Sequence, residues 1–158
     1  MIFIDTQIWI FARKSPDKQR FTALSKYNLF QDFHQQALEF LANVIKENII
    51  CMTFHQLFEI YHSLAFRGRK QIIQDVKKFC SELLNSKFIH WYSITETQIS
   101  DCLKLSAQSN IHIWDYVCIV PLIQDVDVLY SCDRHFQDPT FSQFKKPILN
   151  PLNKWFLI

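Results

Sequence analysis

The residues best able to carry out chemistry in this sequence are four carboxylates in apolar surroundings. Asp5 and Asp133 each follow a short apolar stretch that is typical of a buried strand. Asp115 is the only charge within residues 111–123, where an unpaired ionised group would be costly. Glu59 lies in the middle of a predicted helix, at the edge of its apolar face. If these side chains converge, they form a strongly acidic site.

Such a site would need a counter-ion. Two carboxylates about 4 Å apart repel each other by roughly 4 kcal/mol at an effective dielectric constant of 20. Mg²⁺ or Mn²⁺ suits a set of carboxylate oxygens that leaves room for water and for a substrate phosphate. A cation in this position can lower the pKa of a bound water and orient the water for in-line attack on phosphorus. The chemistry implied is metal-dependent hydrolysis of a phosphodiester bond.

A simpler role is open to three of the four carboxylates. Asp5, Asp115 and Asp133 all stand where a helix can begin, and aspartate at that position satisfies free backbone N–H groups. This N-cap interpretation does not extend to Glu59, which is expected in mid-helix. It also leaves unexplained why four carboxylates occur in elements whose ends should converge.

The sequence around the carboxylates predicts strands that alternate with helices. Apolar stretches predict strands at residues 2–4, 49–52, 88–92 and 126–132, with a short last strand at 147–149. Helical spacing predicts helices at 6–13, 28–47, 54–66, 72–84, 95–107 and 111–123, and a helical turn at 133–136. Right-handed crossovers then give an α/β fold, a three-layer α/β/α sandwich with a mainly parallel central sheet, in one domain that spans residues 1–158. Ligands in such folds bind beyond the C-terminal ends of the strands, where Asp5 and Asp133 fall.

Composition narrows the class of protein. Apolar residues make up 49% of the chain and there is one glycine, which favours a compact, helix-rich domain over hairpins. The apolar stretches are interrupted by charge before the roughly 20 residues that a membrane span requires, and no secretion signal is recognisable. The five cysteines show no C-x-x-C spacing and lie in apolar contexts, which predicts buried free thiols. We therefore expect a soluble protein of the reducing cytoplasm.

Four segments of the chain, in order, resemble the motifs of PIN-domain ribonucleases. MIFIDTQIWI resembles their opening strand with its D-T-N, and MTFHQLFEIYHSL resembles their second strand and the glutamate-bearing helix that follows. IWDYVCIVPLIQDVDVLYSCDRHF is similar to their aspartate-led helix, strand and T-x-D-x-x-F ending, and PILNP to their final strand. The likeness extends over nearly the whole chain.

The resemblance implies specific roles and partners. Asp5, Glu59, Asp115 and Asp133 would hold Mg²⁺ or Mn²⁺ and position its water, and Ser131 would support them through its hydroxyl. Small members of this family are the VapC-type ribonuclease toxins of toxin–antitoxin pairs, which are generally homodimers that a small antitoxin protein neutralises. The activity implied is that of a metal-dependent endoribonuclease with an RNA substrate.

Basic and aromatic residues could contribute to RNA binding. The basic run at residues 67–70 could contact phosphates without reading sequence, and so could Arg13 and Lys14, which leave the predicted first helix. The net charge of +2 is otherwise too small to indicate a nucleic-acid-binding protein. Trp9 and Trp114 neighbour the proposed site and could stack on a base.

Three positions depart from the PIN pattern. Gln7 stands in place of an asparagine and Ser131 in place of a threonine. Pro121 interrupts the stretch that follows Asp115 and would kink or shorten that helix. These departures keep a second interpretation open, in which the chain is a catalytically inactive PIN-like module that binds protein or RNA.

Two other patterns suggest different enzymes. His55, Glu59 and His62 share a helical stripe, and Glu59 with His62 forms the E-x-x-H of di-iron bundles, but that architecture needs a second copy and lacks strands. An aspartate after a first strand is also typical of haloacid-dehalogenase-like phosphatases, in which a second aspartate follows two residues later. Gln7 occupies that place, which argues against this class.

Overall fold

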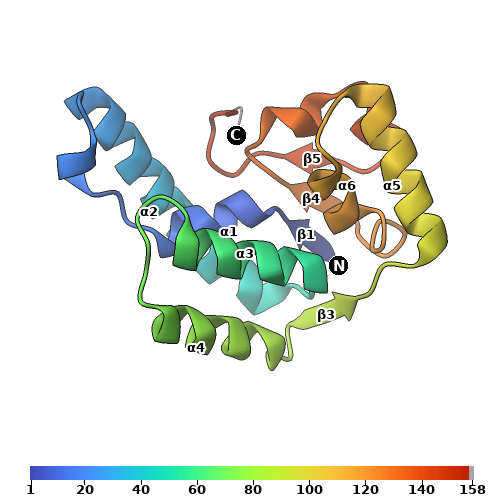
Figure 1. The fold of residues 1–158 in the computed structure, drawn as a ribbon, viewed down its shortest axis with the longest axis horizontal. Helices are drawn as coiled ribbons and strands as arrows, with labels where there is room; N and C mark the ends of the chain where they lie inside the picture. The colour runs from blue at the N-terminus through green and yellow to red at the C-terminus, as the bar shows by residue number, and fades with distance from the viewer. Residues whose placement is uncertain (157–158) are drawn as a thin grey trace.

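A parallel sheet forms the centre of the molecule. The structure is a computed structural model that describes residues 1–156. Within these residues the sheet has five strands, in the order β3 (Ile89–Tyr92), β2 (Ile50–Thr53), β1 (Ile2–Ile4), β4 (Val128–Tyr130) and β5 (Ile148–Leu149) (Figure 1). Every pair of neighbouring strands is parallel. The first strand of the chain therefore lies in the middle, paired with β2 on one side and with β4 on the other.

Helices cover both faces of this sheet (Figure 1). The α-helices are α1 (Thr6–Arg13), α2 (Leu24–Glu47), α3 (Phe54–Phe66), α4 (Ile73–Leu84), α5 (Glu96–Ser109), α6 (Ile113–Ile119) and α7 (Pro139–Ser142). Two short 3-10 helices are η1 (Lys18–Arg20) and η2 (Arg134–Gln137).

The side chains of β1 show how the layers arise. Successive residues of a strand point to opposite faces, so Ile2 and Ile4 belong to the core under α1–α4, while Phe3 belongs to the core under α5–α7. Both cores consist of apolar side chains, which explains why this strand has no polar residue. The predicted α/β class, the three layers and the parallel sheet are confirmed.

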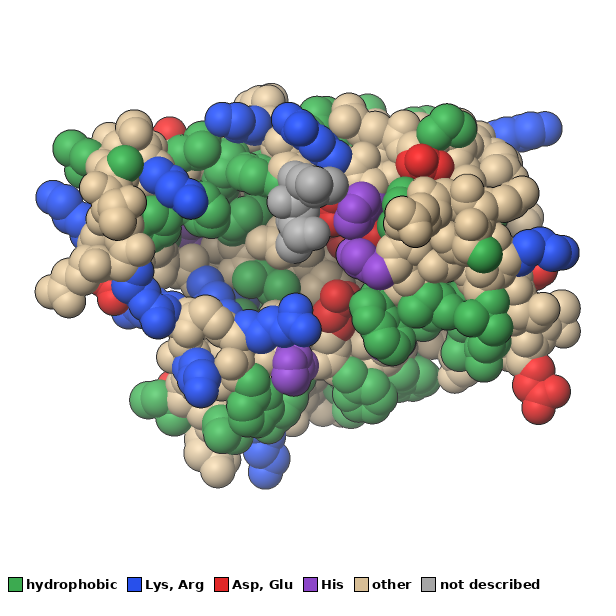
Figure 2. Space-filling model, turned by 45° about the horizontal axis from the view of Figure 1, so that its top comes forward, with side chains coloured by type: hydrophobic (Ala, Val, Ile, Leu, Met, Phe, Trp, Pro, Cys, Tyr) green, Lys and Arg blue, Asp and Glu red, His purple; other side chains and the backbone are tan. Residues whose placement is uncertain are grey.

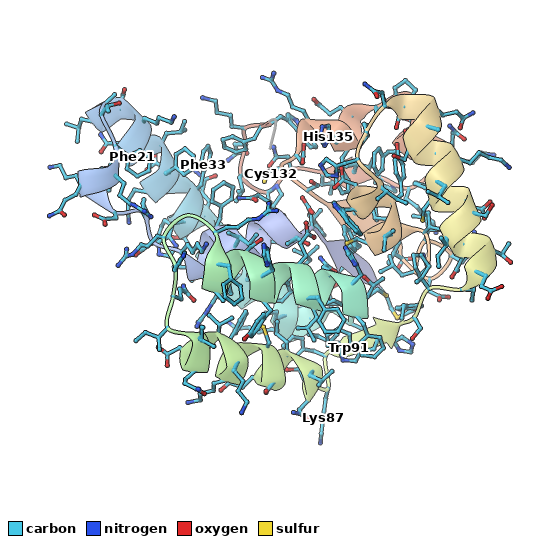
Figure 3. The ribbon with its side chains drawn as sticks, in the orientation of Figure 1. Phe21, Phe33, Lys87, Trp91, Cys132 and His135 are labelled. Carbon is cyan, nitrogen blue, oxygen red and sulfur yellow. The ribbon has the colours of Figure 1, made fainter. Side chains whose placement is uncertain are left out.

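Helix α1, which directly follows the first carboxylate, is held firmly in place. The indole Nε1 of Trp9 donates to the carbonyl oxygen of Ile4 at 3.3 Å, and the Trp9 side chain is buried. Phe11 packs against Phe30 and Phe33 of α2, with ring centroids 5.9 and 5.4 Å apart; Phe33 and the neighbouring Phe21 are labelled in Figure 3. These contacts fix the start of α1 against the end of β1.

Several predicted bounds differ from the structure. The predicted helix at 111–123 is wrong in length, because α6 ends at Ile119, shortly before Pro121, which lacks the N–H that a continuing helix needs. The predicted strand at 126–132 is shortened to β4, and α2 begins at Leu24, four residues before the predicted start at residue 28. The stop of α3 is as predicted: the helix ends at Phe66 and Gly68 adopts a φ of 56°.

Two further expectations concern the whole chain. All five cysteines lie in the described part of the chain, where each is buried with a free thiol, as predicted. Among residues 1–156, no helix combines the length and the apolar character that crossing a membrane demands.

The packing of β1 predicts a large cost for truncating its core residue. Phe3→Ala removes a fully buried ring between β1 and the α5–α7 layer, and we expect the free energy of unfolding to fall by roughly 3–5 kcal/mol. Phe58→Ala, at a phenylalanine that is 66% exposed, is the control and should change stability by no more than about 0.5 kcal/mol. Urea denaturation of both variants measures the difference. Equal losses would show that β1 does not organise the core.

Candidate active site

All four predicted carboxylates line one cavity, of about 810 Å³, on the surface of the protein. Asp5 directly follows β1, and Asp133 comes three residues after the end of the adjacent β4. From β1 the chain continues to β2 on one side of the sheet, and from β4 it continues to β5 on the other side. Ligands in open α/β sheets bind beyond the ends of two strands whose connections diverge in this way. Glu59 reaches the cavity from α3 and Asp115 from α6. Figure 2 shows acidic and histidine side chains close together at this hollow, with Lys and Arg side chains beside them.

Asp5 is held by a serine rather than used as a helix cap. Its carboxylate makes no capping hydrogen bond to α1, so the N-cap interpretation fails at this position. Ser131 Oγ instead donates to Asp5 Oδ2 at 2.7 Å, and the same oxygen of Ser131 accepts from the backbone N–H of Asp133 at 3.0 Å. Burial raises the pKa of Asp5 to about 7, and the negative charges of Glu59 and Asp133 contribute to the rise.

Asp133 does act as a cap. Its Oδ1 accepts from the backbone N–H of His135 at 2.9 Å at the start of η2, so the N-cap interpretation is correct here. The other oxygen, Oδ2, lies 3.5 Å from His135 Nδ1 at the edge of the cavity. Burial raises the pKa of Asp133, although the His135 N–H and the two neighbouring imidazoles oppose the rise. Oδ1 of Asp133 thus caps η2, and Oδ2 remains able to bind a ligand.

Glu59 is held in place by a hydrogen bond from α1 and by the attachment of its own helix, α3, to β1. Thr6 Oγ1, in the first turn of α1, donates to Glu59 Oε2 at 2.7 Å. Gln56, one turn before Glu59 on α3, donates through Nε2 to the carbonyl oxygen of Ile4 at 2.6 Å. Helix α3 is therefore tied to the end of β1, and Glu59 is brought beside Asp5.

Asp115 is largely buried beside the other three carboxylates. It is the third residue of α6, and its side chain is 12% exposed. Burial raises its pKa to about 9, and the charges of Asp5, Asp133 and Glu59 add to the effect in that order. Because α6 ends just before Pro121, the proline shortens the helix without turning Asp115 out of the cavity.

Two histidines of the site were missed in the sequence. His135 Nδ1 lies 3.2 Å from Asp115 Oδ2, and His112 Nδ1 lies 3.7 Å from the same oxygen. The two imidazole rings meet edge to face, with centroids 4.9 Å apart. Their proximity to carboxylates in the sequence was a usable signal, since His112 precedes Asp115 by three residues and His135 follows Asp133 by two.

The predicted RNA contacts Arg13 and Lys14 both have partners inside the protein. Lys14 lines the cavity, but its Nζ donates to the carbonyl oxygens of Ser63 and Arg67 near the C-terminal end of α3. The guanidinium of Arg13 lies 4.4 Å above the ring of Phe79. Their part in RNA binding stays a prediction, and their observed role is to fasten α1 to α3 and α4.

Further exposed basic residues stand at this end of the molecule. Arg67 and Arg69, in the loop after α3, line the carboxylate cavity. A second cavity of about 610 Å³ adjoins the first at shared residues. Its charged lining is mainly basic, with Arg69, Lys70 and Lys78 among its residues and Asp75 and Glu82 as its acidic members. The basic surface therefore continues outward from the carboxylates.

Aromatic side chains form part of the cavity rim. Trp114 is 51% exposed and stacks on His55, with ring centroids 4.7 Å apart and an interplanar angle of 11°. Phe58 lies exposed on the same cavity. Trp9, by contrast, is buried in the core, so the structure leaves only Trp114 of the two tryptophans available to stack on a base.

The donor set fits a hard divalent cation. The cavity is lined by carboxylates from four different segments. Burial raises the pKa of Asp5, Asp115 and Asp133, and repulsion by neighbouring carboxylates adds to the rise at Asp5 and Asp115. Carboxylate oxygens are the ligands that Mg²⁺ and Mn²⁺ prefer, and a bound cation would relieve the repulsion. The residues present are therefore suited to such an ion.

Comparison with known proteins finds similarity in structure alone. No protein-family model matches the sequence, and no curated protein matches it either. VapC20 of Mycobacterium tuberculosis, a toxin that cleaves the sarcin–ricin loop, superposes with a TM-score of 0.60 and 13% identity over 82% of this chain and 87% of its own.

Two other solved structures resemble the chain over nearly its full length. VapBC2 of Rickettsia felis, bound to a DNA fragment from its promoter, gives a TM-score of 0.55 and 12% identity over 95% of this chain and 98% of the other. FitAcB of Neisseria gonorrhoeae gives a TM-score of 0.56 and 11% identity over 97% of this chain and 99% of the other. These are PIN-domain toxin–antitoxin proteins, and the likeness confirms the predicted PIN-type fold.

The raised pKa of Asp115 predicts how stability depends on pH when no metal is bound. The folded protein favours protonated Asp115 up to about pH 9, whereas the unfolded chain ionises it near 3.8, so stability is lost as pH rises between these values. Asp115→Asn removes this loss. We expect the variant to exceed the wild type by about 2 kcal/mol or more at pH 8 in EDTA, and to match it near pH 4.

Urea denaturation at the two pH values measures this difference. Asp127→Asn is the control, because Asp127 is fully exposed and pairs with the N-terminal ammonium, which lowers its pKa. That variant should gain no stability at pH 8. An Asp115→Asn variant that is no more stable than the wild type at pH 8 would contradict the burial of an unfavourable charge.

Proposed function

We propose that this PIN-fold chain is a metal-dependent endoribonuclease that hydrolyses RNA phosphodiester bonds and is the toxin of a toxin–antitoxin pair. The observation that carries the proposal is the convergence of Asp5, Glu59, Asp115 and Asp133 from four elements on one cavity. Similarity to VapC20, which cleaves the sarcin–ricin loop, supports RNA as the substrate.

The four carboxylates would hold Mg²⁺ or Mn²⁺. Such an ion, when bound, supplies a Lewis acid for the scissile phosphate and acidifies a water. Ser131 fixes one oxygen of Asp5 and Thr6 fixes one oxygen of Glu59, so both carboxylates are oriented before any ligand arrives. His135, which contacts Asp115 and Asp133, limits how far these two can move.

The substrate would approach over the basic surface. Arg67 and Arg69 stand on the cavity and Lys70 continues the surface outward, so phosphates that flank the scissile bond on this side meet positive charge. Arg13 and Lys14 remain proposed RNA contacts, because their positive charges add to the electrostatic attraction of this surface for phosphates. The exposed face of Trp114 offers a surface on which an unpaired base can stack.

The structural similarities also bear on the protein partners of this chain. VapBC2 and FitAcB support a small antitoxin protein as the partner of this chain. We propose that the chain is a single nuclease domain, acts in the cytoplasm as a homodimer and is neutralised there by that antitoxin.

The nuclease proposal predicts that catalysis depends on Asp5. Asp5→Asn keeps the shape of the side chain and removes a metal-binding charge, so we expect cleavage of single-stranded RNA with Mg²⁺ or Mn²⁺ to fall roughly 100-fold or more. Asp101→Asn, at an exposed carboxylate on α5, is the control and should cleave like the wild type. Gel analysis of a labelled RNA measures both rates.

Two outcomes would overturn the mechanism. Cleavage that survives Asp5→Asn would remove the carboxylates from catalysis. A wild-type protein that binds RNA or a partner protein but neither cleaves RNA nor binds Mg²⁺ or Mn²⁺ in calorimetry would be the binding module that the departures at Gln7 and Pro121 left open.

The basic surface predicts a position-dependent effect on RNA affinity. Arg67→Ala and Lys70→Ala should each weaken RNA binding several-fold and reduce the salt slope of log K by about 0.7–1, because one phosphate contact is lost. Lys87→Ala is the matched control, since Figure 3 shows Lys87 far from the site marked by His135. Fluorescence anisotropy at several salt concentrations measures both quantities. Equal effects at Lys70 and Lys87 would mean that the RNA does not follow this surface.

A further inference from the structure

Two histidines that the proposed nuclease site does not require meet one of its carboxylates at the cavity edge. His112, Asp115 and His135 each offer one ligand atom, and these atoms all lie within 4.8 Å of one another. Both imidazoles direct Nδ1 toward the same oxygen, Asp115 Oδ2, at 3.7 and 3.2 Å. His112 is the residue before α6 and His135 belongs to η2, so the cluster joins two separate segments of the chain.

The two nitrogen–oxygen separations are close to those around a small tetrahedral cation. With metal–ligand bonds of about 2.0–2.1 Å, neighbouring ligand atoms of a tetrahedral ion stand about 3.3 Å apart. The two nitrogen–oxygen distances bracket this value. An ion could therefore be bound with small side-chain movements and without a rearrangement of the backbone.

The cluster is also accessible. The side chains of His112 and His135 are 46% and 18% exposed, so a hydrated ion can reach them from solvent, while Asp115 closes the inner side. Only His135 Nδ1 is within hydrogen-bond distance of Asp115 Oδ2, whereas His112 Nδ1, at 3.7 Å, is too far for a hydrogen bond. A cation between the three groups would give both imidazole nitrogens a partner.

We propose that His112, Asp115 and His135 form a second site, for a borderline divalent cation of the Zn²⁺ class, with water completing the coordination. Imidazole nitrogen favours Zn²⁺, Co²⁺ and Ni²⁺, whereas Mg²⁺ prefers oxygen ligands, so the cluster and the four carboxylates differ in the ions they select. Asp115 belongs to both sets. If the proposed function holds, an ion on the histidines withdraws Asp115 from the acidic site, and Zn²⁺ and Mg²⁺ compete.

Calorimetric titration of the metal-free protein with Zn²⁺ tests the site without measuring activity. We expect one equivalent to bind to the wild type, and binding to weaken at least about tenfold in His112→Ala and in His135→Ala, since each loses a ligand. His112→Ala changes an exposed side chain, which keeps the test valid if His135→Ala fails to fold. His62→Ala is the matched control, because His62 faces the same cavity outside the cluster.

The remaining outcomes separate this site from the nuclease site. Asp5→Asn should retain Zn²⁺ binding, and Mg²⁺ binding should be unchanged in His112→Ala. Zn²⁺ binding that is unaffected in both histidine variants, or that is lost in Asp5→Asn while His112→Ala retains it, would overturn the proposal. Failure of the nuclease proposal appears instead in the RNA cleavage assay, which this titration does not use.

Discussion

The structure depends on holding four carboxylates at one cavity, three of them largely buried. Burial and mutual repulsion raise the pKa of Asp5 and Asp115 to about 7 and 9, so the folded chain stores an unfavourable interaction at its centre. Few donors offset it: Ser131 serves Asp5 and Thr6 serves Glu59. An arrangement of this kind persists only if the surrounding scaffold is stable enough to oppose it, and a cation converts the same repulsion into binding energy.

The scaffold meets that requirement through the central position of β1. Its alternate side chains contribute to both cores, and its last carbonyl, that of Ile4, accepts hydrogen bonds from Trp9 of α1 and Gln56 of α3. The strand, the helix that follows it and the helix that carries Glu59 are thus tied together at one point. The site is therefore held by a strand whose side chains are buried in both cores. Close packing of this kind limits how far the carboxylates can move from their positions.

Much of this arrangement was readable in the sequence, because it follows from local patterns. Strand ends located Asp5 and Asp133, and a helical stripe located Glu59. Contacts between distant segments were not readable: the meeting of His112 with His135 and the engagement of Lys14 with α3 depend on how α6, η2 and α1 pack. The predicted end of α6 was wrong for a different reason. Its apolar residues continue through the turns after Ile119, and periodicity alone does not distinguish a buried turn from a buried helix.

The order of the strands in the chain also governs when the cavity can exist during synthesis. β1 is made first, yet its neighbour β4 comes more than a hundred residues later, and the hydrogen bond from Ser131 to Asp5 joins the same distant segments. A chain growing from its N-terminus therefore carries Asp5 and Glu59 long before Asp133 can join them. The cluster of four carboxylates cannot assemble on the ribosome until residue 133 has emerged, so the nascent protein lacks it for most of its translation.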